Sequence, residues 1–200
     1  MNKWFWGVIV FIVCVVVGLL LYPDQEERAQ SAYERAFAVE RDAGGDQALT
    51  LYDQVIVEYP ATQGAALSEE GRLRIFAARE KQLQKEMRDQ IARLLLTLNG
   101  YQSMFGQMPS SISDLDNGDY FFDSDYLSEM IPKPYTTYLA LSADAPPRIW
   151  PLHAEKDTVY ASIDPKGSLL KMNKAEALQQ IEAGYTEVAK KGQMVFLQQK

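Results

Sequence analysis

Residues 86–101 of this 200-residue chain read EMRDQIARLLLTLNGY. Apolar residues in and before this stretch recur at steps of three, four and seven, the spacing of one face of an α-helix. They form a stripe made up of Leu73, Phe76, Leu83, Met87, Ile91, Leu94, Leu95 and Leu98. Thr62 can cap this helix just after Pro60, so the pattern predicts a helix over 62–105. Its part over 91–98 is the most apolar, and we expect it to lie against a core.

Two shorter helices are expected before the long one. Apolar residues recur near a 3.6-residue period over 24–42 and again over 47–58, where Pro60 ends the pattern. The segment DAGGD at 42–46 between them is a turn signal. The spacing therefore predicts an antiparallel helical hairpin.

Several residues of the predicted hairpin have the spacing found in a known family of helical repeats. Ala48, Tyr52 and Pro60 lie where the second helix of a tetratricopeptide repeat has its characteristic residues, and Ala36 lies at a small-residue position of the first. Residues 27–60 thus resemble one such repeat. Because about three repeats are usually needed to bury a continuous core, a single one argues against a peptide-binding superhelix. A plain helical hairpin that packs on the following helix is the alternative.

The segment WFWGVIVFIVCVVVGLLLY, residues 4–22, has no charged residue. As a helix it spans roughly 28 Å, close to the ~30 Å hydrocarbon core of a bilayer. Aromatic residues at both ends suit the membrane interface, and Pro23 ends the helix. We therefore expect a transmembrane anchor over 1–23. A cleaved signal peptide is the alternative, but its apolar core is shorter and ends in small residues.

The charges beside the anchor predict its orientation. Lys3 precedes it, whereas residues 24–27 after it hold three acids and no base. Basic residues favour the cytoplasmic side, so we expect a single-pass inner-membrane protein with a cytoplasmic N-terminus and a periplasmic body. Cys14 and Gly18 form a small-xxx-small pair, the candidate contact of a weak homodimer. A monomeric anchor is the alternative.

A second pattern of residue types begins in the stretch 86–101 and extends to about residue 142. It comprises a leucine-rich helix end with a tyrosine, a glycine, a proline with hydroxyl residues, and a proline pair before a strand: Tyr101, Gly106, Met108 to Ile112, Leu115, Tyr126-Leu127, Ile131 to Tyr135 and Tyr138 to Leu141. This pattern resembles the globular part of type IV pilin-like proteins, most closely the type II secretion pseudopilins. The resemblance implies a long helix that leads into a sheet.

The anchor departs from the same family. Its members carry a basic leader, a processing glycine and a glutamate five residues into the mature apolar helix. Here Gly7 is followed by VIVFI, and neither a prepilin leader nor that glutamate is recognised. The resemblance therefore implies a pilin-like domain on a fixed anchor, and we expect no fibre subunit.

An acidic loop spans residues 114–129. Its carboxylates are Asp114, Asp116, Asp119, Asp123, Asp125 and Glu129. Several close carboxylates suit calcium, and some pseudopilins bind calcium in a loop. The spacing here does not match an EF-hand, and Asp116-Asn117-Gly118 is already a good turn. A solvated loop and a calcium site are both open.

The last third predicts strands and one helix. Strands are expected over 136–142, over 148–152 as an edge strand because Pro151 removes a donor, and over 194–197. The runs 158–163 and 168–172 flank a type I turn at Asp164–Gly167. Asn173 and Glu176 form a capping pair for a helix that Gly192 closes, with Leu178, Ile181, Tyr185 and Val188 as its buried face. The sum is an α+β protein with a small antiparallel sheet.

Composition excludes several functions. The formal net charge of −7 argues against a nucleic-acid partner. Cys14, within the expected anchor, is the only cysteine and His153 the only histidine, so the rest of the chain can form no disulfide and a typical histidine-built metal site is out of reach. No catalytic motif is recognised, and we assign no catalytic, cofactor-binding or metal-binding residue.

We therefore expect three regions: an anchor over 1–23, a tetratricopeptide-like hairpin over 24–61, and a long helix with a pilin-like domain over 62–200. The expected function is that of a non-catalytic, membrane-anchored envelope protein that contacts other proteins, as a scaffold or accessory factor of a pilus-like or secretion assembly. A periplasmic ligand- or calcium-binding module on a membrane anchor is the alternative.

Overall fold

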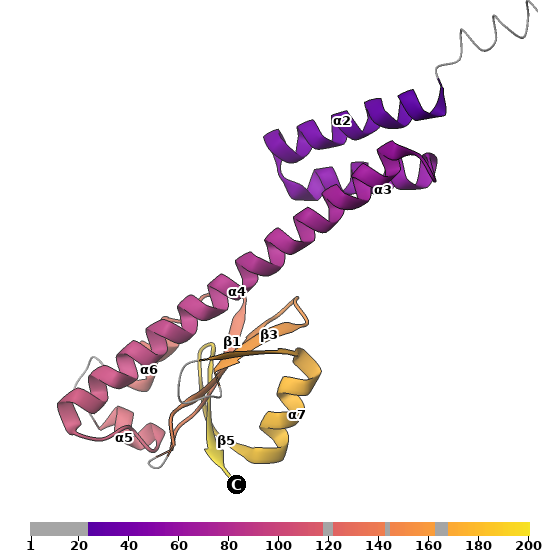
Figure 1. The fold of residues 1–200 in the computed structure, drawn as a ribbon. Helices are drawn as coiled ribbons and strands as arrows, with labels where there is room; N and C mark the ends of the chain where they lie inside the picture. The colour runs from indigo at the N-terminus through magenta and orange to yellow at the C-terminus, as the bar shows by residue number, and fades with distance from the viewer. Residues whose placement is uncertain (1–23, 118–121, 143–144, 163–167) are drawn as a thin grey trace, which may run out of the picture. The chain divides into compact units, whose positions relative to one another are not determined.

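A computed structural model describes residues 24–117, 122–142, 145–162 and 168–200 (Figure 1). The chain divides into two compact units, which meet in sequence between Lys81 and Gln82. The protein is a mixed α+β protein, with helices and one six-stranded sheet. Among the described residues, no helix is both long and apolar enough to cross a bilayer. The predicted anchor over 4–22, with Cys14 and Gly18, lies outside them.

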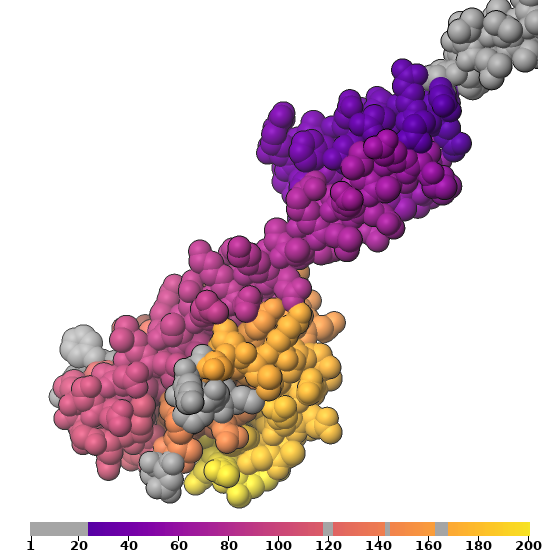
Figure 2. Space-filling view, in the orientation of Figure 1, coloured from indigo at the N-terminus to yellow at the C-terminus, as the bar shows by residue number. Residues whose placement is uncertain are grey.

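From residue 24 onward, where the structure describes it, the first unit is built from three helical segments. Helix α2 (Gln25–Ala43) and helix α3 (Gly45–Glu58) form the predicted hairpin, and helix α4 (Gln63–Phe105) begins after it. In the space-filling view the indigo α2 and the purple α3 adjoin (Figure 2). The hydroxyl of Thr62 accepts a hydrogen bond from the Ala65 amide at 3.1 Å, so the predicted cap is confirmed.

The core of this unit is made mostly of small residues. Its buried members are Ala36, Ala48, Tyr52 and Ile75. The ring of Tyr52 lies against Gly71, where a Cβ atom would come within 2.5 Å of the ring. Small residues at these positions allow the helices to approach closely, but they leave little apolar area to bury.

The predicted stripe on α4 is confirmed only in part. Met87, Ile91, Leu94 and Leu98 are buried, as expected. Leu73 and Phe76 are not, with exposed fractions of 63% and 48%. Ile75 is the buried residue in this region, because α4 meets the hairpin there through the side that carries Gly71 and Ile75. The prediction was wrong for the first turns because it assumed one buried face along the whole helix.

The second unit contains the sheet. Its strands are β1 (Tyr135–Ala140), β2 (Arg148–His153), β3 (Thr158–Ser162), β4 (Leu169–Asn173), β5 (Tyr185–Lys191) and β6 (Met194–Gln199). They lie in the order β4-β3-β2-β1-β6-β5. Helices α5 (Ile112–Asp116) and α6 (Ser124–Glu129) precede the sheet, and α7 (Lys174–Gly184) connects β4 to β5.

Apolar residues cover both faces of the sheet, because alternate residues of a strand point to opposite sides. The C-terminal half of α4 packs on one face, where Leu139, Ile149 and Phe196 join Ile91 and Leu98. Helix α7 packs on the other, in a cluster of Ala140, Trp150, Leu152, Val159, Ala161, Met172, Ala177, Ile181, Val195 and Leu197. The unit is thus a three-layer arrangement of helix, sheet and helix (Figure 1).

Two predictions about the sheet were wrong. It is not purely antiparallel, since β1 pairs with β6 in parallel. Nor is β2 an edge strand, since it lies between β3 and β1. Pro151 faces Thr137 of β1 in the register, while β2 and β3 pair through Ile149 and Ser162. Pro151 lies outside that β2–β3 register pair, so its missing N–H does not interrupt it.

The end of the predicted last helix was also wrong. The Asn173 side chain does accept a hydrogen bond from the Glu176 amide at 2.8 Å, which confirms the cap. The helix stops at Gly184, however, and Tyr185–Lys191 is a strand that pairs with β6. A β-bulge between Glu187 and Ala189 breaks the two-residue alternation. Without that alternation, the three-residue spacing of Tyr185 and Val188 looked helical in the sequence. In the strand, Val188 is exposed.

Candidate functional site

The acidic loop was the main sequence-based candidate, and two of its carboxylates, Asp114 and Asp123, serve as helix caps. Asp114 accepts from the amides of Ser110 and Ser111 at 2.7 and 3.0 Å and completes a capping box with Ser111 on α5. These contacts, with the Ser110 hydroxyl first, lower the pKa of Asp114. Asp123 caps α6 by accepting from the Tyr126 amide at 2.6 Å. Asp119 lies outside the described residues, and Glu129 ends α6.

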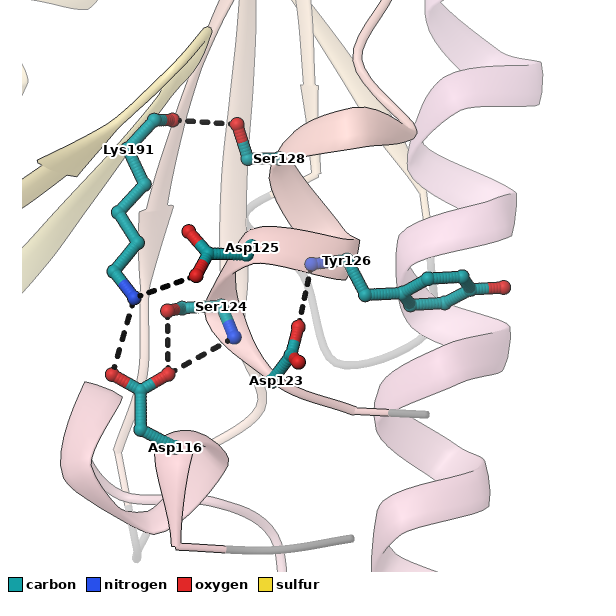
Figure 3. A network of polar contacts seen from close by, with 7 residues as sticks. All are labelled: Asp116, Asp123, Ser124, Asp125, Tyr126, Ser128 and Lys191. Atoms are coloured by element: carbon teal, nitrogen blue, oxygen red, sulfur yellow. Dashed lines mark hydrogen bonds and ion pairs between the residues drawn. The ribbon is translucent and has the colours of Figure 1, made fainter. Parts of the chain in front are cut away.

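A lysine from β5 enters this acidic region (Figure 3). Its ammonium lies 3.4 Å from a carboxylate oxygen of Asp116 and 3.4 Å from one of Asp125. Asp116 also accepts from the amide of Ser124 at 3.1 Å and from its hydroxyl. Lys191 therefore provides a positive charge between two carboxylates that the sequence had suggested as cation ligands.

The charges in this network favour the ion pair. Burial raises the pKa of Asp116, but the hydrogen bonds from Ser124 and the ammonium of Lys191 outweigh it, and the pKa is lowered overall. Burial lowers the pKa of Lys191, and the two carboxylates outweigh that effect and raise it. Within the described ranges no group of three acidic, histidine or cysteine residues is placed to hold a metal ion.

The same lysine is held through its backbone. The Ser128 hydroxyl donates to the Lys191 carbonyl oxygen at 2.6 Å (Figure 3). The next residue, Gly192, turns the chain into β6 with a φ of +52°, and a Cβ there would lie 2.4 Å from the Ser128 Oγ atom. The network thus ties the β5–β6 turn to α6, and its role is structural.

A groove in the second unit is the stronger candidate for binding. We call it the α4 groove, and it has a volume of about 290 Å³. It is lined by Glu86, Asp89, Gln90, Arg93, Met130, Pro132, Lys133, Pro134, Tyr135 and His153. Four of these residues come from α4, five from the segment before and at the start of β1, and His153 from the end of β2.

Gln90 is the unusual residue of this groove, because its side chain is polar and only 5% exposed. Its Oε1 atom accepts from the hydroxyl of Thr137 at 3.3 Å. Its Nε2 atom is buried and has no hydrogen-bond partner within the described part of the chain. A buried amide without a partner costs roughly 1–3 kcal/mol, so its presence calls for an explanation.

His153, the only histidine, lies at the edge of the same groove. Its ring packs edge-on against Tyr135 with 5.0 Å between the ring centroids, and its Nδ1 atom accepts from the Glu155 amide at 3.1 Å. The Tyr135 hydroxyl donates to Glu86 at 2.8 Å. Burial, followed by the Glu86 carboxylate, raises the pKa of Tyr135. This arrangement fixes the two rings against each other.

The first unit has one partly buried charge network. Glu40 of α2 accepts two hydrogen bonds from the Arg74 guanidinium, at 3.0 and 2.7 Å, and one from the Tyr52 hydroxyl at 2.6 Å. The bonds from Arg74, then that from Tyr52, outweigh burial and lower the pKa of Glu40. Arg74 also lies over the Phe37 ring at 5.6 Å. These contacts bind α2 to α4 within the unit.

Large apolar residues of the first unit lie outside its core. They are Phe37, Val57, Leu73 and Phe76. Successive helix residues are about 100° apart, so Leu73 and Phe76 share one side of α4, away from Gly71 and Ile75. The hairpin packs against Gly71 and Ile75, which leaves Leu73 and Phe76 as an exposed apolar pair.

Sequence reasoning named the carboxylates and His153 but missed the lysine and Gln90. Lys191 is 66 residues from Asp125 in sequence, so no local spacing relates them. Gln90 fell within a charged run, and only its place in the stripe-bearing part of α4 hinted at burial. Comparison with protein-family models, with curated proteins and with solved structures finds no match.

Proposed function

We propose that this chain is a non-catalytic, single-pass envelope protein that is anchored in the inner membrane through residues 4–22 and acts by contact with other proteins. In its specific form the body is periplasmic and serves a pilus-like or secretion assembly as a scaffold or accessory factor. The charge-free anchor segment and the two sequence resemblances, over 27–60 and about 86–142, motivate this proposal.

The observation that carries it is the exposed apolar pair Leu73 and Phe76. The hairpin unit buries Ile75 with Tyr52 and alanines, while Leu73 and Phe76 remain 63% and 48% exposed. A helical repeat that stands alone cannot bury its apolar face, and contact with a neighbour is the usual way to cover it. The pair therefore supports a protein partner for the first unit.

The acidic loop and His153 support a non-catalytic role. Asp114 and Asp123 cap helices, and Asp116 and Asp125 pair with Lys191. The histidine contacts a tyrosine ring and a backbone amide. A general acid or base needs a reacting group within hydrogen-bond reach and surroundings that bring its pKa near the working pH. The contacts described here serve packing and chain reversal instead.

The proposal can be tested by the size of the native complex. Membranes that contain the full chain would be solubilised in a mild detergent and separated by native electrophoresis. We expect the wild type in a complex larger than its own monomer or dimer, and a Leu73→Ser/Phe76→Ser variant released from it. The matched control is Val57→Ser, which removes an exposed apolar side chain elsewhere on the same unit. A wild-type chain that migrates alone contradicts the proposal.

A further inference from the structure

Strand β5 forms one edge of the sheet, and among the described residues its outer side has no strand partner. An edge strand presents backbone N–H and C=O groups that can pair with another strand. The opposite edge, β4, has Lys171 at its middle position, and self-pairing about that residue would place two lysines opposite each other. β5 instead carries an exposed acid, Glu187, and an exposed base, Lys190.

The bulge in β5 places Glu187 and Lys190 on the same face of the sheet. In a regular strand, residues three apart point to opposite faces. Here Val188 is the extra residue, so that Glu187 lies opposite Leu197 and Lys190 lies opposite Val195, two positions apart on β6. Leu197 and Val195 both belong to the cluster that α7 covers. Glu187 and Lys190 therefore lie on the α7 face, with one ladder position between them.

This arrangement of charges is complementary to itself. The ladder position between Glu187 and Lys190 is that of Ala189. A two-fold axis through Ala189 would pair β5 in antiparallel with β5 of a second copy, with Glu187 directly opposite Lys190 of the partner subunit. Symmetry makes this pair twice, and opposite charges that face each other across two strands stabilise the pairing. Within the described residues neither side chain has an ion pair.

The neighbouring side chains of β5 fit the same pairing. Val188 is 47% exposed and lies next to the axis, so the pairing would cover an apolar side chain that the described residues leave open. Lys191 lies on the other face, where its ammonium pairs with Asp116 and Asp125 (Figure 3). Lys191 therefore brings no unpaired positive charge to the contact.

We infer that β5 binds β5 of a second copy of this chain, edge to edge and in antiparallel, about a two-fold axis at Ala189. The pairing continues the six-stranded sheet into the second copy. This inference goes beyond the proposed function and does not depend on it. Its residues belong to the second unit, whereas Leu73 and Phe76, which carry the proposed partner contact, belong to the first.

The test is disulfide crosslinking of the full chain in membranes, with Cys14→Ser so that no native cysteine remains. Ala189→Cys in this background should give a disulfide-linked dimer on mild oxidation, because directly opposite residues of paired strands lie within disulfide reach. Leu170→Cys, at an exposed position on the other edge strand, is the matched control and should stay monomeric. No dimer with Ala189→Cys, or an equal yield with Leu170→Cys, overturns the inference.

Charge exchange tests the register. In the Ala189→Cys chain, either Glu187→Lys or Lys190→Glu places like charges opposite each other twice and should lower the dimer yield by about fivefold. The double variant Glu187→Lys/Lys190→Glu brings opposite charges together again and should return the yield to that of the Ala189→Cys chain. A yield that is insensitive to these charges overturns the inference. Absence of the β5 dimer with an intact native complex contradicts this inference alone, whereas a wild-type chain without any larger complex contradicts the proposed function.

Discussion

Gly71 of α4 lies directly against the ring of Tyr52 of α3, where a Cβ atom would come within 2.5 Å of Cζ. The contact explains how a small hairpin can pack closely on α4, with the large Tyr52 ring filling the space beside a glycine. The clash involves a ring that is itself fully buried, so the ring cannot move aside at little cost.

Gly71→Ala should therefore destabilise the first unit by about 2 kcal/mol, in the range of overpacked cores. Hydrogen exchange of the α3 amides in the full chain is the measurement, and those amides should exchange faster. Gly184→Ala is the control, because nothing lies within 4 Å of the added Cβ and its stability should hold or rise. Unchanged exchange in Gly71→Ala would show that the helices do not pack in this way.

Arg74→Met should lower the stability of the same unit by about 1 kcal/mol, because Glu40 loses two of its three hydrogen bonds while Arg74 is half exposed. Arg41→Met, which breaks the fully exposed pair with Asp42, is the control and should leave stability unchanged. Urea unfolding followed by hydrogen exchange distinguishes them. Equal effects of the two variants would contradict a structural role for the Glu40 network.

The Glu40 network also predicts a dependence on pH. The pKa of Glu40 is lowered in the folded chain, so its contribution is fully present above the ordinary glutamate pKa of about 4.3. That contribution is lost as pH falls below this value and through the lower folded pKa. The difference in stability between wild type and Glu40→Gln should therefore shrink on acidification below pH ~4. A difference that is constant with pH would exclude an ionised Glu40.

Calcium should leave the thermal midpoint of the wild-type chain unchanged, whether it is added or chelated, because the Lys191 ammonium already occupies the space between Asp116 and Asp125 and pairs with both. Lys191→Met should lower stability by about 1 kcal/mol, since the two carboxylates are then left facing each other with little compensation. A rise in the midpoint of the wild type with calcium would revive the alternative of a calcium-binding module.

A reporter fused after Lys200 tests the expected orientation of the anchor. An enzyme that is active only in the periplasm should be active, because Lys3 precedes the anchor and acids follow it. The control is the same reporter on a chain that begins after residue 23. Activity only with a cytoplasmic reporter would overturn the placement.

Predictions from the sequence were confirmed where a single local rule, such as helical period or turn chemistry, determines the structure. The α2–α3 hairpin, the caps at Thr62 and Asn173, and the pairing of β3 with β4 follow from local period and turn chemistry. Predictions were wrong where contacts between distant parts of the chain determine which residues are buried. Two different sides of α4 are buried along its length, so Leu73 and Phe76 matched an apolar stripe that the described residues leave exposed.

The sheet shows the same limit. A bulge in residues 185–191 breaks the alternating pattern by which a strand is recognised in a sequence. The strand forms because its backbone pairs with β6. The candidate groove could not be predicted at all, since it joins α4 to residues 130–135 and 153 through contacts between distant parts of the sequence. Long-range pairing of this kind leaves no signal in local spacing.

The most direct test of the central claim is photo-crosslinking in intact membranes. A photoreactive residue would replace Phe76 in the full chain, with Thr50, an exposed residue of α3, as the control position. The account predicts that the Phe76 position crosslinks to another envelope protein, mapped by mass spectrometry, and that the Thr50 position does not. A Phe76 position that yields only the uncrosslinked chain would contradict a protein partner at this surface.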